Sequence, residues 1–227
     1  MGTDLSNTLI IAACYFVLFA LGELLYHVFK LKVEITRKFV HIGTGFLALL
    51  FPLLLDNHWL VLLLCTAFAL ILMVSLHYDL LKSINAIDRK SVGSLMYPIA
   101  VYGCYLVFIK HGNQYIYYYL PILILAISDP LAALAGKKWA WGKYRIAGAN
   151  KTLFGSVMFF ASAVAVMLCC WFFLYTAPQH PGLFVAGIGI IALIATVTEA
   201  ISRDGYDNVT IPLSVIIALF LTKSWLI

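Results

Sequence analysis

Long runs of apolar residues dominate this sequence and restrict the folds that it can adopt. A helix needs about 20 apolar residues to cross the hydrocarbon core of a bilayer. Hydrophobic residues make up 63% of the chain and charged residues 11%, whereas a soluble domain carries about 25% charged residues. The apolar runs do not alternate with polar residues at period two, as the strands of a membrane barrel would. We therefore predict an all-α, polytopic integral membrane protein, with residues 1–227 forming a single transmembrane domain.

Eight segments satisfy the length requirement for a membrane span. The chain leaves no room for a separate soluble domain beside them, and its five cysteines lie in apolar segments without metal-ligand spacing. The predicted spans are 8–29, 39–55, 59–76, 93–110, 116–135, 152–176, 183–201 and 209–226.

The basic residues lie almost entirely in alternate loops. Loops 30–38, 77–92, 136–151 and 202–208 contain every Lys and Arg except Lys110 and Lys223. Cytoplasmic loops carry an excess of Lys and Arg, so we expect these four loops in the cytoplasm and both termini outside. The net charge of +5 follows from these loops and does not indicate a nucleic-acid partner.

A first polar cluster precedes the second span, at Glu34-Ile35-Thr36-Arg37-Lys38-Phe39-Val40-His41. If a helix begins here, Glu34, Arg37, Lys38 and His41 are three or four residues apart and share one face. Arg and Lys bind phosphate oxygens, and an ionisable group inside a span is often functional. The alternative is a positively charged membrane anchor with an interfacial histidine.

A second cluster follows the fifth span, at Ser128-Asp129-Pro130-Leu131-Ala132-Ala133-Leu134-Ala135-Gly136-Lys137-Lys138. On a helix, Asp129, Ala132, Ala133 and Gly136 form one face of small residues beside an acid. Mg²⁺ takes one or two carboxylates together with phosphate oxygens, so this face is a candidate metal site. The alternative is that Asp129 caps a turn at Pro130.

A third cluster opens the sixth span, at Lys151-Thr152-Leu153-Phe154-Gly155-Ser156, with Gly142 and Gly148 before it. Glycines, a lysine and a hydroxyl at a helix N-terminus are typical of anion binding. The spacing is not that of a Walker A motif. A helix start with Thr152 as N-cap, and a Gly-Ser packing face, explains the same residues.

A fourth cluster joins the last two spans, from Glu199 to Pro212. Glu199 and Asp207 are acids at or in the membrane, which favours a function, and with Asn208 they can complete a metal shell around Asp129. Arg203 follows Glu199 by four residues, a spacing that permits an ion pair on one helix. A turn built on Asp-Gly and Asp-Asn is the alternative.

At these residues the chain resembles the polyprenol kinase family, which comprises CTP-dependent dolichol kinases, phytol and farnesol kinases and a related CTP-dependent diacylglycerol kinase. The matching pieces occur in family order and span most of the chain. They are Arg37-Lys38-Phe39-Val40-His41, Arg89 with Gly93, Asp129-Pro130 with Ala133 and Gly136, Lys151-Thr152 with Gly155-Ser156, and Glu199 with Asp207-Asn208 and Pro212.

The resemblance implies a membrane enzyme that uses CTP and Mg²⁺ to phosphorylate a long-chain isoprenoid or related lipid alcohol at the cytoplasmic face. Phosphoryl transfer needs positioning and charge neutralisation more than covalent help, which fits these residue types. The expected catalytic residues are Asp129, Lys151, His41 and Lys138, with His41 a candidate base. The expected metal ligands are Asp129, Glu199, Asp207 and Asn208, and the expected nucleotide contacts are Arg37, Lys38, Arg89, Gly136, Lys137, Thr152, Gly155 and Ser156.

Two other functions stay open from the sequence. The family also resembles phosphatidate cytidylyltransferases, which transfer CMP to a lipid phosphate, in combining an acid with lysines. A small-solute or ion transporter would place polar residues near the bilayer midplane, whereas the polar residues here gather at one face. The oligomeric state and the acceptor lipid are not determined by the sequence.

Overall fold

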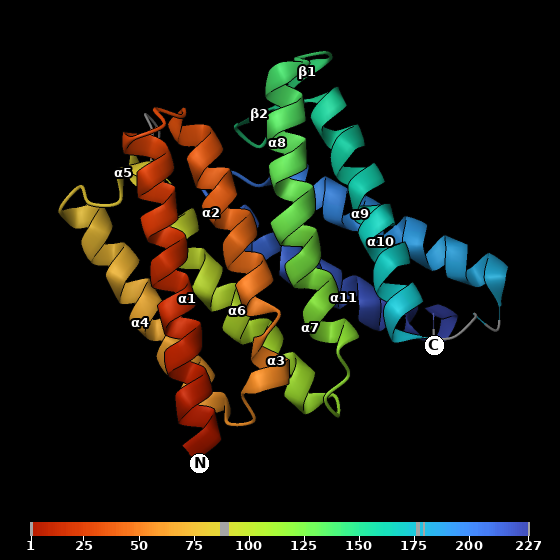
Figure 1. The fold of residues 1–227 in the computed structure, drawn as a ribbon. Coiled ribbons are helices and arrows are strands. Elements are labelled where there is room, and N and C mark those ends of the chain that lie inside the picture. Colours follow the sequence, from red (N-terminus) through yellow and green to blue (C-terminus); the bar gives the residue numbers. More distant parts are fainter. Residues whose placement is uncertain (1, 87–90, 176–177, 179, 227) are drawn as a thin grey trace.

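Helices form nearly all of the computed structural model, which describes residues 2–86, 91–175, 178 and 180–226 (Figure 1). The N-terminal half contains α1 (Gly2–His27), α2 (Val33–Ala48), α3 (Phe51–Leu54), α4 (His58–His77), α5 (Lys82–Asn85) and α6 (Gly93–Lys110). The C-terminal half contains α7 (Ile116–Leu123), the π-helical segment η1 (Ile124–Ser128), α8 (Asp129–Lys138), β1 (Lys143–Ile146), β2 (Ala149–Thr152), α9 (Leu153–Leu174), α10 (Pro181–Ile201) and α11 (Asp207–Leu226).

Eight helical segments in the described part of the chain are long and apolar enough to cross a membrane, which confirms the predicted fold class. The second span begins at Val33 and not at residue 39, so Arg37 and Lys38, expected in the preceding loop, lie on a helix. The fifth span runs without interruption through α7, η1 and α8. A chain that continues as a helix through Pro130 excludes the alternative of a turn at Asp129-Pro130.

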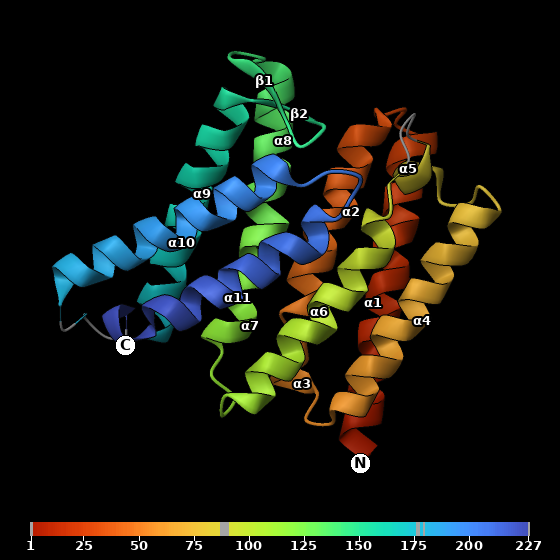
Figure 2. The ribbon, with the colours of Figure 1, turned by 180° about the vertical axis from the view of Figure 1, so that it is seen from behind.

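The basic segments lie toward one end of the bundle. Figures 1 and 2 show α5, the β1–β2 hairpin and the connection between α10 and α11 toward the same end, with the N-terminus at the opposite end. Helices α10 and α11 are strongly tilted against α1, α2 and α4 and pack along each other. The clusters that are separate in the sequence therefore converge at one end of the fold.

The short antiparallel hairpin departs from the all-helical prediction. Strands β1 and β2 pair Tyr144 with Lys151 and Arg145 with Asn150, where the sequence indicated a loop. Ala147 and Gly148 form the turn with φ values of 49° and 80°, and two-residue hairpin turns of type I′ need positive φ at both positions. The hairpin carries Lys151 and Thr152 to the start of α9.

A proline interrupts the hydrogen bonding between α2 and α3. Pro52 has no N–H, so it cannot donate to the carbonyl of Ala48 four residues earlier. The buried hydroxyl of Tyr118, on α7, donates to this carbonyl at 2.8 Å. Inside a membrane an unpaired backbone carbonyl costs several kcal/mol, so this contact fixes α7 against the end of α2.

Replacing Tyr118 by Phe should destabilise the bundle, because the Ala48 carbonyl then lies buried without its donor. We expect a loss of about 1–3 kcal/mol in the free energy of unfolding. Unfolding in detergent, followed by circular dichroism, measures it. Tyr119→Phe, at the half-buried neighbouring position, serves as the control, and equal stability of the two variants would refute this role of Tyr118.

Candidate functional site

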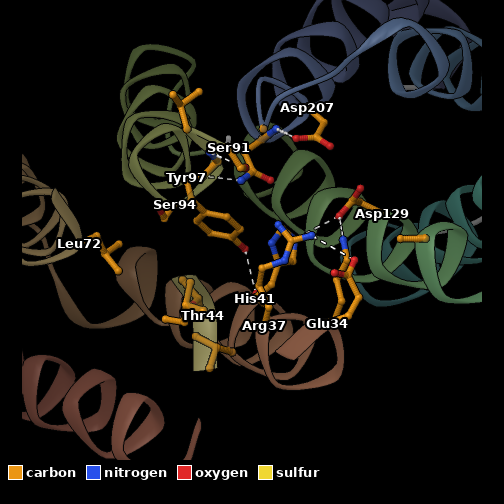
Figure 3. A pocket seen from close by; sticks show the side chains of 18 of the residues that line it. Glu34, Arg37, His41, Thr44, Leu72, Ser91, Ser94, Tyr97, Asp129 and Asp207 are labelled. Carbon is orange, nitrogen blue, oxygen red and sulfur yellow. Dashed lines mark hydrogen bonds and ion pairs between the residues drawn. The ribbon is translucent and has the colours of Figure 1, made fainter. Parts of the chain in front are cut away.

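One cavity of about 550 Å³ brings together residues from all four polar clusters of the sequence. Helix α2 forms one wall, α8 and the start of α9 another, and the starts of α6 and α11 with the end of α10 close it. Figure 3 shows Arg37, His41, Asp129 and Asp207 approaching this cavity from three different helices. The polar residues in its wall include Glu34, Arg37, Lys38, His41, Asp129, Lys137, Asn150, Lys151, Thr152, Ser156, Glu199, Asp207 and Asn208.

The centre of the site is an ion pair between α2 and α8. Lys38 Nζ lies 2.6 Å from Asp129 Oδ2, and the two residues are 6% and 5% exposed. Two charges at this depth are stable only as a well-formed pair, and removing one partner from a buried pair costs about 3–5 kcal/mol. The pair therefore fixes α2 against α8 and places both charges in the cavity wall.

Glu34 forms ion pairs with two further basic residues of the cavity wall, Arg37 and Lys137. Its Oε1 lies 3.3 Å from Arg37 Nη2 and 2.9 Å from Lys137 Nζ. The spacing expected for a helix starting near Glu34 is thus correct, and it brings Arg37 beside the lysine that follows Gly136. The Nε atom of Arg37 is buried without a hydrogen-bond partner, so the guanidinium retains a donor for a ligand.

The π-helical segment η1 determines which ring nitrogen of His41 carries a hydrogen. In a π-helix a carbonyl accepts from the residue five positions later, and for Leu125 that residue is Pro130, which has no N–H. His41 Nε2 lies 3.0 Å from the Leu125 carbonyl oxygen and donates to it. Since a carbonyl only accepts, Nε2 carries the hydrogen, and only Nδ1 of a neutral His41 can act as a base.

The hairpin and α9 complete the opposite wall. Lys151 Nζ pairs with a carboxylate oxygen of Glu199, and Thr152 Oγ1 accepts from the Gly155 N–H at 3.1 Å as the N-cap of α9. A Cβ on Gly136 would lie 2.6 Å from Thr152 Oγ1. Both glycines therefore allow α8 and α9 to approach closely, while also lining the cavity.

The start of α11 contributes Asp207 and Asn208. Asn208 Nδ2 donates to the Gly93 carbonyl at 2.7 Å, and a Cβ on Gly93 would lie 2.9 Å from this nitrogen. Asp207 Oδ1 accepts from the backbone N–H of Asn208 at 3.1 Å. Asp207 takes part in none of the described ion pairs. It lines the cavity, where its carboxylate is available to a cation.

The charges in the described wall balance. Four basic side chains, Arg37, Lys38, Lys137 and Lys151, face four acidic ones, Glu34, Asp129, Glu199 and Asp207. Among the described residues, no three His, Cys, Asp or Glu side chains gather closely enough to form a metal centre by themselves. The donor set fits a cation that takes one or two carboxylates and receives its other oxygens from a phosphate, as Mg²⁺ does.

Two of the predicted contacts lie elsewhere, and a third cannot be placed. Lys138, the neighbour of Lys137, does not line the cavity, and its Nζ lies 4.4 Å from the centre of the Trp139 ring. Arg203 pairs with Asp204 at 3.5 Å and not with Glu199, because α10 ends at Ile201. Arg89 lies outside the described residues.

The structure adds residues to the site that the sequence did not indicate. The Tyr144 hydroxyl lies 2.6 Å from Ser156 Oγ and links β1 to α9. Tyr97 lines the cavity, and its ring packs edge-on against His41 at 4.9 Å between centroids. A prediction of the hairpin would have placed Tyr144 opposite Lys151, but an aromatic residue inside a span gives no signal of its own.

The buried ion pair leads to a stability prediction. Lys38→Met should lower the free energy of unfolding by about 3–5 kcal/mol because it leaves Asp129 buried and unpaired. The double variant Lys38→Met/Asp129→Leu should recover part of this loss. The free energies of unfolding of the wild type, the single variant and the double variant, measured in detergent, test this prediction.

Lys137→Met is the matched control for this prediction. The Lys137 side chain is 63% exposed in its pair with Glu34, and such pairs contribute about 1 kcal/mol or less. If Lys38→Met costs no more than Lys137→Met, the buried pair does not hold α2 against α8.

Comparisons with known proteins complete the description of the site. No model of a protein family and no solved structure matches the chain. A phytol kinase from Synechocystis is 31% identical over 208 residues, which cover 90% of this chain and 87% of the relative. The chain therefore belongs to the polyprenol kinase family of membrane phosphotransferases.

Proposed function

We propose that this protein is a lipid-alcohol kinase that transfers the γ-phosphate of CTP, with Mg²⁺, to an isoprenoid alcohol held in the membrane. The observation that carries the proposal is a single cavity whose polar end contains paired lysines and acids and whose other end is apolar. A phosphate donor and a lipid acceptor need these two surroundings side by side. The related phytol kinase supports the class of reaction, and the choice of CTP rests on the family resemblance.

The basic residues of the wall are suited to holding a triphosphate. Lys38 and Lys151 are each paired with an acid in the wall, and phosphate oxygens are alternative partners for both. Arg37 adds a fork of donors that matches phosphate geometry. These groups place positive charge where negative charge builds up on the transferred phosphoryl group, a contribution of several kcal/mol in comparable sites.

The acids of the wall fit the metal that such a reaction uses. Asp129 and Asp207, with Glu199 and Asn208 beside them, supply the oxygen donors that Mg²⁺ prefers. Because the described wall carries equal numbers of basic and acidic side chains, a bound triphosphate adds net negative charge that a divalent cation would offset. When bound, Mg²⁺ supplies charge neutralisation and orientation of the phosphates.

The acceptor hydroxyl belongs near Asp129 and His41, where the polar end meets the apolar end. His41 Nε2 is engaged with the Leu125 carbonyl, so we assign to His41 the positioning of η1, which precedes Asp129, and the hydroxyl proton to a carboxylate. In a loose phosphoryl-transfer transition state, the acceptor hydroxyl does not need to lose its proton early, so a strong base contributes little. Positioning of the two substrates is then the main contribution of these residues.

A transfer assay with CTP labelled at the α or the γ phosphate tests the proposed function. Purified protein receives Mg²⁺ and either an isoprenoid alcohol or phosphatidic acid. We expect label from the γ position in the alcohol and none from the α position. Label from the α position in phosphatidic acid would instead establish a cytidylyltransferase and overturn the proposal.

Two lysine variants test whether the catalytic site is the cavity of the structure. The sequence predicted both Lys151 and Lys138 as catalytic residues, but only Lys151 lines the cavity. Lys151→Met should lower kcat/KM by about 10²–10³-fold, because it removes a charge-assisted contact in the cavity. Lys138→Met should leave kcat/KM near the wild-type value, because Lys138 lies over Trp139 outside the cavity. Equal losses in both variants would contradict this placement of the site.

We also propose that the polar end of the cavity opens to the cytoplasm. Lys and Arg gather in the loops at this end, and loops of that composition are retained in the cytoplasm. Alkaline phosphatase fused to either terminus should therefore be active, whereas a fusion in the 202–208 loop should not be. The opposite pattern would place the polar end outside.

A further inference from the structure

The cavity continues from the polar cluster into the interior of the N-terminal helices. This apolar arm is walled by Tyr15, Phe19, Phe51, Cys65, Phe68 and Leu72, which come from α1, α3 and α4. Each of the six is between 2% and 8% exposed, so none of them faces the surrounding lipid. In Figure 3, Leu72 lies on the far side of Tyr97 and His41 from Asp129. The arm therefore begins where the charged wall ends.

The length of the arm follows from the helix that lines it. Besides these six residues, Leu76, which is 40% exposed, lines the outer end of the cavity on α4. From Leu76 to Cys65, near the closed end, the helix rises about 16 Å at 1.5 Å per residue. An extended chain advances about 1.2 Å per backbone bond, so the arm accommodates about 13 bonds. This matches an isoprenoid tail of about three or four five-carbon units, each of which adds four backbone carbons.

Three aromatic rings close the arm at its inner end. Tyr15 lies 4.5 Å from Phe68 and 6.4 Å from Phe51 between ring centroids. The Tyr15 hydroxyl donates to the Thr44 carbonyl at 3.2 Å, which holds this ring in place. Beyond the rings, Ile11 and Val61 are at most 1% exposed and do not line the cavity. A longer tail has no space in this direction.

We propose that the arm is the binding site for the acceptor tail and that Tyr15, Phe51 and Phe68 limit the length of the alcohol that can be phosphorylated. The inference rests on the proposed kinase function and adds to it the location and the size of the acceptor. The arm excludes polyprenols of many units from productive binding. Their tails would not fit with the hydroxyl beside Asp129.

Variants that change the depth of the arm in opposite directions test the inference. Cys65→Phe fills the arm and should lower kcat/KM for a four-unit alcohol at least tenfold relative to a two-unit alcohol. Phe51→Ala removes part of the closed end and should raise the relative kcat/KM for a six-unit alcohol about tenfold. Cys170→Phe places the same bulk at another buried cysteine, on α9 outside the cavity wall, and should leave the profile unchanged.

A second measurement does not depend on catalysis. An isoprenoid alcohol with a diazirine at the end of its tail should, on irradiation, label the segment around Cys65 and Phe68 in the wild-type protein. Labelling confined to α9 or α10 would overturn the inference, as would a chain-length profile that neither cavity variant shifts in an active enzyme. Labelling of the arm without transfer from CTP to any alcohol would support the subsite and refute the kinase function.

Discussion

The buried pair of Lys38 and Asp129 is the interaction on which the site depends. Neither charge is stable alone among helices that face hydrocarbon, so each residue requires the other at a distance of 2.6 Å. Meeting this requirement brings α2, near the start of the chain, against the continuation of the fifth span. The same constraint operates at Lys151 and Glu199, which join the hairpin to α10. Charges that line the cavity thus also determine the packing of the helices around it.

Paired charges in a cavity wall differ from those in a closed core because a ligand can replace one of the partners. A buried ion pair contributes little net stability compared with apolar packing. An ion pair that borders a cavity therefore indicates a role beyond stabilising the fold. A phosphate oxygen that approaches Lys38 or Lys151 replaces one anionic partner by another, so the lysine is never left unpaired. The released carboxylate then becomes available to a cation. These ion pairs therefore keep the cavity wall neutral and its donors in position.

The sequence predicted the spans and the clusters well, because both depend on local patterns. Apolar runs of sufficient length define helices whatever their neighbours, and helical spacing correctly placed Asp129, Ala132 and Gly136 on one face of α8. The same spacing extends this face to Lys137 and turns Lys138 away from it, which explains why only Lys137 lines the cavity. Partners across helices were not predictable in this way. Glu199 lies near Lys151 rather than Arg203 because the helix ends at Ile201, a boundary that depends on tertiary contacts.

The apolar arm was the least predictable feature, and the reason is physical. A residue such as Phe68 satisfies a membrane span equally well against lipid, against another helix or against a bound tail, since all three are apolar surroundings. Only the three-dimensional packing distinguishes them. An unfilled cavity in this setting loses dispersion contacts on its walls, whereas a lipid tail restores those contacts without any cost of removing polar groups from water. A cavity that is polar at one end and apolar at the other therefore favours an amphipathic molecule whose tail matches the depth of the arm.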